Sequence, residues 1–143
     1  MTLHLIKLCV GCDSVEDLAA WIEWRRKEAR KRRRKFEHAH VTRMSPRRTA
    51  ELLDGGSLYW VIKGMVQTRQ RLLDVRPFVD DHGIGRCRLI LDPKPIRTEW
   101  QPRRPFQGWR YLAPADAPRD LKLDGGAGMP AALGAALAEL GLR

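Results

Sequence analysis

The sequence predicts an α+β domain: a small, bent, mostly antiparallel β-sheet or barrel with flanking helices, one of them long and basic. Residues 57–92 hold three segments rich in β-branched, aromatic and aliphatic side chains, separated by glycine, proline and aspartate. This pattern is typical of consecutive antiparallel strands. Before them, an apolar stripe at helical spacing follows a capping-box-like start, and a run of arginine and lysine extends that helix.

The composition indicates one folded domain. The chain has 143 residues, of which 43% are hydrophobic and 31% charged, enough to form a core. We expect a single α+β domain over residues 1–124, then a flexible glycine joint and a C-terminal helix over 125–143 that packs on the same domain. We see no signal sequence and no apolar run near the roughly 20 residues that span a membrane. Three cysteines, an odd and small number, favour a reducing cytoplasm.

The first half of the chain alternates strands and helices. Residues 3–10 are mostly apolar and predict a first strand. Ser14 precedes two acidic residues in a first helical turn, and the apolar stripe of residues 15–22 follows. Good helix formers then allow the helix to continue through Arg30, and a helix that reaches Lys35 would span roughly 30 Å. Its second half has no apolar stripe, so we expect it to project into solvent.

A second strand over 36–44 places His38, His40 and Thr42 on one face. Ser45 and Pro46 then resemble the start of a helix that runs to about residue 53. The remaining elements that we expect are strands at 57–63, 65–75 and 86–92, with Arg76 and Pro77 beginning the turn between the last two, a strand at 96–101, and a shaped loop leading into a strand at 102–112.

The central strand at 65–75 has two distinct faces. Val66, Thr68, Gln70 and Leu72 alternate with Gln67, Arg69, Arg71 and Leu73, so one face presents a row of arginine and glutamine. Trp60 and Trp100 are more simply explained as core residues.

The net charge of +10 is localised. Residues 25–48 carry twelve basic and two acidic side chains, whereas the rest of the chain carries fifteen of each sign. Nine of the eleven residues from Arg25 to Lys35 are cationic. Because like charges repel at helical spacing, a solvated helix end does not explain so many, although that interpretation stays open. The field favours a polyanion as partner, and nucleic acid first among polyanions.

A second motif interleaves arginine with aromatic residues at 103–111. Aromatic rings stack on unpaired bases while arginines hold the backbone, but the same rings can instead close the end of the core. The predicted nucleic-acid interface comprises Arg25, Arg26, Arg30, Lys31, Arg32, Arg33, Arg34, Lys35, Arg47, Arg48, Arg69, Arg71, Arg103, Arg104, Phe106, Trp109 and Arg110.

Other chemistry-bearing residues carry weaker signals. Cys9 and Cys12 have the spacing of half a zinc site, but no second such pair exists, so we expect buried, unreactive thiols. His38 and His40 could form an acid–base set with nearby carboxylates, yet Asp80 and its neighbours are better explained as a turn. We therefore assign no catalytic residue, metal or cofactor.

Most of the chain, from His4 to Leu112, resembles a family of small alphaproteobacterial proteins known as domain of unknown function 1489. The segments that carry the resemblance are Leu5-Ile-Lys-Leu-Cys-Val-Gly-Cys12, Gly56-Ser-Leu-Tyr-Trp-Val-Ile-Lys-Gly64 and Arg103-Arg-Pro-Phe-Gln-Gly-Trp-Arg-Tyr111. This resemblance implies no activity.

The segment Gly64-Met-Val-Gln-Thr-Arg-Gln-Arg71 looks like the Gly-x-Lys-Thr-x-Glu-x-Arg motif of the ASCH branch of the PUA-like superfamily. Gly64 and Arg71 match, Thr68 is displaced by one position, and Val66 and Arg69 replace the lysine and the glutamate. The resemblance implies a small bent barrel, often RNA-binding. The replacements count against the hydrolytic chemistry of some ASCH proteins.

We therefore expect a module that binds nucleic acid, with structured or ribosomal RNA favoured over DNA and with no membrane partner. Two alternatives remain. One is a hydrolase of a modified base or nucleoside that uses a pocket around Lys63, Gly64 and Thr68. The other is an adaptor that docks on an acidic protein.

Overall fold

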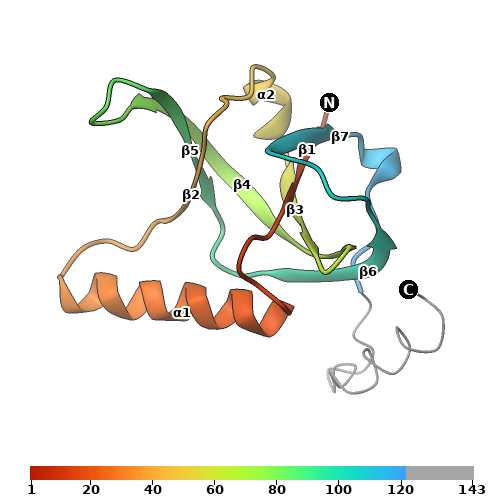
Figure 1. Ribbon diagram of the computed structural model, residues 1–143, viewed down its shortest axis with the longest axis horizontal. Coiled ribbons are helices and arrows are strands. Elements are labelled where there is room, and N and C mark those ends of the chain that lie inside the picture. The colour runs from red at the N-terminus through yellow and green to blue at the C-terminus, as the bar shows by residue number, and fades with distance from the viewer. Residues whose placement is uncertain (122–143) are drawn as a thin grey trace.

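The computed structural model describes residues 1–121 of the chain (Figure 1), so the predicted joint and helix at 125–143 lie outside the described residues. The elements follow in the order β1 (His4–Leu8), α1 (Val15–Lys31), β2 (His38–Thr42), α2 (Thr49–Leu52), β3 (Ser57–Ile62), β4 (Met65–Val79), β5 (Gly85–Leu91), β6 (Ile96–Pro102), β7 (Trp109–Leu112) and the short 3-10 helix η1 (Pro114–Asp116).

The α+β class is confirmed, but the sheet is open rather than closed into a barrel. Its strands lie in the order β2-β5-β4-β3-β1-β7, and β6 pairs with β4 outside that row. β1 runs parallel to β3, whereas the other pairs are antiparallel, so the sheet is mixed. Within residues 1–121, β2 and β7 are the two ends of the row and do not pair with each other. α1 lies across one end of this sheet (Figure 1).

β4 is the longest strand and joins the two parts of the sheet. Its first half pairs with β3 on one edge and β6 on the other, and its second half pairs with β5. The predicted end at residue 75 is wrong, because β4 continues through Pro77 to Val79. Proline has no backbone N–H, but no strand in the described structure pairs with the outer edge of β4 there. The turn instead lies at residues 80–84, before β5.

The hairpin between β3 and β4 turns on two residues. Lys63 and Gly64 have φ angles of 50° and 77°, and positive φ at both central positions is what a type I′ turn requires. The strand predicted at 57–63 therefore ends one residue earlier, at Ile62.

α1 begins as predicted and ends earlier than predicted. The Ser14 side chain accepts a hydrogen bond of 3.1 Å from the Asp17 N–H, which caps the first turn. Val15, Leu18 and Ile22 are the buried side chains of the helix. The helix ends at Lys31 rather than Lys35, so the last four cations of the basic run follow it in a turn.

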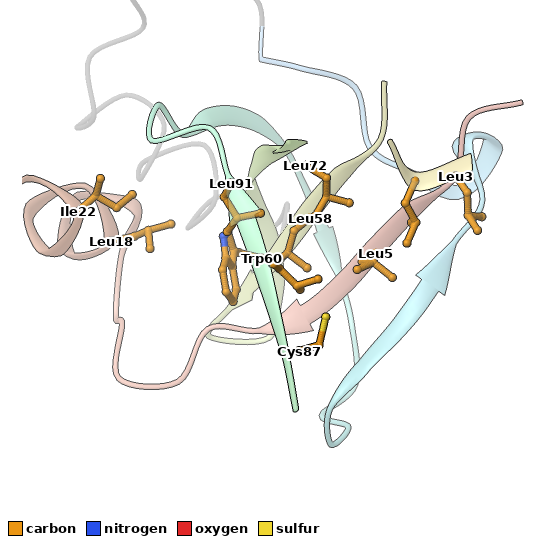
Figure 2. Close-up of a cluster of buried hydrophobic side chains, with 11 residues drawn as sticks. Leu3, Leu5, Leu18, Ile22, Leu58, Trp60, Leu72, Cys87 and Leu91 are labelled. Carbon is orange, nitrogen blue, oxygen red and sulfur yellow. The ribbon is translucent and has the colours of Figure 1, made fainter. Parts of the chain in front are cut away.

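Two hydrophobic clusters occupy the two faces of the sheet. Leu58 and Trp60 of β3 belong to the larger cluster, which also holds Leu18 and Ile22 of α1 (Figure 2). Tyr59 and Val61, which alternate with them, belong to the smaller cluster. β3 is therefore buried on both faces. Trp60 is a core residue as predicted, whereas the prediction for Trp100 is wrong, since that side chain is 39% exposed.

Between β2 and β3, the helix is shorter than predicted and the chain after it passes close to the N-terminal segment. α2 begins at Thr49 without a side-chain cap, so the predicted start at Ser45 and Pro46 is wrong. The chain then passes so close to β1 that a Cβ on Gly56 would lie 2.2 Å from the Leu3 carbonyl oxygen. Only glycine fits this close approach of backbone to backbone.

Candidate nucleic-acid interface

The first two arginines of the basic run attach α1 to the chain that follows it. Arg25 donates a hydrogen bond of 2.9 Å to the Ala39 carbonyl, and its guanidinium lies 4.8 Å from the centre of the Trp21 ring. The Arg26 guanidinium lies 5.4 Å from the Phe36 ring. Both side chains are half-buried, so their aliphatic parts contribute to packing. Their contacts with Phe36 and Ala39 hold the segment that leads into β2 against α1.

The remaining cations of the run are exposed. Lys31 lies 3.6 Å from Glu28. Within residues 1–121 the others form no ion pair, and these are Lys27, Arg30, Arg32, Arg33, Arg34 and Lys35. They lie at the C-terminal end of α1, where the helix dipole favours cations.

The backbone of the basic end of α1, residues 27–35, is held in a defined turn. The Arg33 N–H donates to the Arg30 carbonyl at 3.1 Å, and the Arg34 N–H donates to the Ala29 carbonyl at 2.9 Å. This is the Schellman pattern of a helix C-terminus. Its left-handed position, usually glycine, is Arg33 with a φ of 53°. The turn lets Phe36 and His38 reach the core, which explains why the helix does not continue to Lys35.

Arg47 and Arg48 lie elsewhere in the molecule. They precede α2, so the strand β2 separates them from the basic end of α1 (Figure 1). Their backbone N–H groups donate to the Tyr111 hydroxyl at 3.0 and 3.2 Å, and the Arg48 guanidinium also pairs with Glu51. The predicted interface is therefore divided between two regions.

The arginine and glutamine face of β4 is largely engaged inside the protein. Arg69 forms two parallel hydrogen bonds to the Asp120 carboxylate, at 2.7 and 2.8 Å, and this pair lowers the pKa of Asp120. Gln67 is buried and donates to the Ile62 carbonyl at 2.8 Å. Arg71 remains exposed.

The segment at 103–111, which comprises the β6–β7 loop and the start of β7, also uses most of its arginine and aromatic side chains internally. Trp109 packs against the larger cluster and donates to the Met44 carbonyl at 2.8 Å, and Phe106 packs against the smaller cluster. The Arg110 guanidinium lies over the Phe106 ring at 5.4 Å. Arg103 is half-buried beside Gln101, whereas Arg104 is exposed. Phe106 and Trp109 therefore close edges of the core, as the alternative interpretation expected.

Several arginines of the sheet pair with carboxylates, unlike the exposed cations that end α1. Arg76 binds both carboxylate oxygens of Glu37 at 3.0 Å, and Arg86 pairs with Asp80 at 2.5 Å. Arg97 pairs with Glu16 of α1. The unbalanced charge of the described chain is thus concentrated at the end of α1.

Sequence reasoning missed one exposed aromatic residue at this end. Trp24 is 60% exposed on α1, within the basic half of the helix. Its position beside, rather than within, the apolar stripe is the signal that could have identified it.

Cys87 is buried as predicted, whereas Cys9 and Cys12 are only half-buried. Cys9 follows β1 and donates its N–H to the Val61 carbonyl at 2.9 Å, and Cys12 precedes α1. Burial raises the pKa of the Cys9 and Cys87 thiols, which disfavours the reactive thiolate. In the part of the chain that the structure describes, no group of three or more His, Cys, Asp or Glu side chains could hold a metal ion.

The two histidines of β2 do not meet the carboxylates proposed for them. His38 is 2% exposed and lies edge-on to Trp21, and His40 lies edge-on to Trp60. Burial lowers the pKa of both to about 4, so both are neutral at pH 7. Asp80 instead organises its turn, because its carboxylate accepts backbone hydrogen bonds at the far end of β5.

The three residues on which the hydrolase alternative depends lie in different environments. Lys63 and Gly64 are exposed at the tip of the β3–β4 hairpin. Thr68 is fully buried, and its hydroxyl donates to the Ile96 carbonyl at 2.8 Å. These groups do not face one common pocket.

Among the described residues, no helix has both the length and the apolar composition needed to cross a membrane. No curated protein and no solved structure matches the chain. A family model does match, over residues 5–143. The chain belongs to the family described as Protein of unknown function (DUF1489).

Proposed function

We propose that this protein is a cytoplasmic module that binds nucleic acid, with RNA as the favoured ligand, and that the basic end of α1 makes the principal contacts. The observation that carries the proposal is the set of exposed cations at this end that have no acidic partner within residues 1–121.

An unpaired cluster of cations stores an unfavourable energy that a polyanion relieves. Neighbouring cations at helical spacing repel one another, whereas phosphates that bind them release condensed counterions. Arginine also forms paired hydrogen bonds with phosphate oxygens. Backbone hydrogen bonds define the C-terminal turn of α1 that carries these cations, which lowers the cost of ordering them on a ligand.

The grouping of the cations at one hydrogen-bonded turn also favours a shaped ligand. Phosphate contacts by themselves do not separate RNA from DNA. A turn that sends cations in several directions fits closely spaced strands at a loop or junction, which are common in folded RNA. Arg47, which is exposed beyond β2 and forms no ion pair within residues 1–121, offers a second contact for an extended ligand.

The experiment compares two variants that each lose three positive charges. One carries Arg32→Ser, Arg34→Ser and Lys35→Ser. The control carries Arg43→Ser, Lys94→Ser and Arg119→Ser, which are exposed, form no ion pair within residues 1–121 and lie outside α1 and its C-terminal turn. Arg33 stays unchanged in both, so the left-handed position of the turn is preserved.

Binding of labelled structured RNA and duplex DNA is measured by fluorescence anisotropy at low salt. We expect the first variant to lose about tenfold or more in RNA affinity and the control to lose much less. Equal losses would show that only the net charge matters. Wild-type protein that binds neither nucleic acid, but retains a partner after nuclease treatment of a lysate, would favour the acidic-protein alternative.

A further inference from the structure

We propose that Trp24 is a base-stacking residue and that the ligand of the basic end is an unpaired stretch of RNA rather than a continuous duplex. This inference rests on the proposed function and specifies its ligand. It begins from Trp24, which is 60% exposed although tryptophan is highly buried on average.

The surroundings of Trp24 distinguish it from the other tryptophan of α1. Trp21 is held in place, because the Arg25 guanidinium lies 4.8 Å from its ring centre and His38 lies edge-on at 5.8 Å. Within residues 1–121, no aromatic ring or guanidinium lies against the ring of Trp24. Its ring is therefore open for contact with a ligand.

The face of α1 around Trp24 is charged rather than apolar. Lys27 and Lys31 follow at three and seven residues, so they lie on the same side of the helix. Glu28, at four residues, is 3.6 Å from Lys31. Trp21, three residues before Trp24, is 45% exposed on the same side but is held by Arg25 and His38. A helix that docks on a membrane or in an apolar groove needs a continuous apolar stripe, and no such stripe continues beyond Trp24.

A single open aromatic ring among cations matches the way proteins grip unpaired strands. The cations follow the phosphates, and the ring stacks on a base whatever its identity. A base inside a continuous duplex is already stacked on both sides and offers no face to the ring. The arrangement thus combines charge complementarity with a contact that only unpaired nucleotides can make.

The test uses the full chain, a single-stranded oligouridine and a blunt RNA duplex of the same length. Trp24→Ala should weaken binding of oligouridine by roughly fivefold to a hundredfold, and binding of the duplex by less than twofold. Trp24→Tyr should restore most of the affinity, because tyrosine also stacks. Trp100→Ala is the control, since Trp100 is likewise exposed but lies on β6. Unfolding curves establish that each variant is folded.

Two results would overturn this inference and leave the proposed function standing. One is unchanged oligouridine binding by Trp24→Ala, and the other is an equal loss of oligouridine and duplex binding. A wild-type protein that binds neither RNA at low salt would instead contradict the proposed function itself. A selective loss that tyrosine rescues supports the inference.

Discussion

The two halves of α1 share one helix but have opposite relations to the rest of the protein. The first half is capped by Ser14 and buries Val15, Leu18 and Ile22. The second half buries no side chain completely and exposes most of its cations. Most helical stability in proteins comes from packing of an apolar face. A packed first half therefore allows the second half to hold repelling charges in a defined position.

The largest expected effect concerns the packed half. Leu18→Ala removes a side chain that is 2% exposed in the larger cluster, so it should lower the free energy of unfolding by about 2–5 kcal/mol. Lys27→Ala, on the same helix but exposed, should change it by less than about 0.5 kcal/mol. Urea unfolding of both variants checks the contrast. Similar losses in the two variants would mean that the halves do not differ as described.

The free energy of unfolding should depend on pH through His38, which is influenced by Arg25 in the middle of α1. The pKa of His38 is lowered to about 4 by burial first and by Arg25 second, whereas an unfolded histidine has a pKa of about 6.5. Between these values the unfolded state binds more protons, so stability falls as the pH decreases from about 6.5 to about 4. The full effect of His38 is about 3 kcal/mol.

The pKa of His40 is also lowered, by burial first and by the charge of Lys7 second, so His40 adds to the loss of stability at low pH. Urea unfolding between pH 7 and pH 4.5 measures the effect, and His38→Gln should flatten the curve. The carboxylates with lowered pKa, such as Asp120, act in a separate window, because their contribution is lost only below about pH 4. A wild-type curve that is already flat over the upper window would show that His38 is accessible to water.

The smallest expected effect concerns the turn that ends the second half. Arg33 has a φ of 53°, which is unfavourable for a residue with a Cβ. Arg33→Gly should therefore raise the free energy of unfolding by about 0.5–1 kcal/mol. Arg33→Ala removes the same charge but keeps the strained conformation, so it should give no comparable gain. Equal gains in both variants would assign the effect to charge repulsion instead.

Local signals in the sequence predicted much of the fold. The serine cap, the apolar stripe of α1 and the alternation along β2 are all set by neighbours in the chain, and the structure confirms them. The end of α1 was missed because Arg33, not glycine, occupies the left-handed position. The course of β4 through Pro77 was missed because only the sheet order shows that this edge is unpaired.

The candidate site was predictable to a smaller extent. The localisation of charge is a property of the sequence, and it coincides with the exposed end of α1. The fate of individual arginines depends on contacts between distant residues. Arg69 pairs with Asp120, which lies 51 residues further along the chain, and no local pattern shows that pair. Likewise, the exposure of Trp24 depends on how α1 sits on the sheet.

The division of α1 into a packed half and a charged half is tested most directly by measuring stability and binding in the same variant. The triple variant Arg32→Ser, Arg34→Ser and Lys35→Ser should unfold within about 0.5 kcal/mol of wild type. Its slope of log affinity against log salt, for single-stranded RNA, should fall by about 0.7 for each phosphate contact that is lost, or roughly 2 in total. A destabilised variant, or a slope equal to that of wild type, would contradict the claim that the basic end of α1 serves binding and not folding.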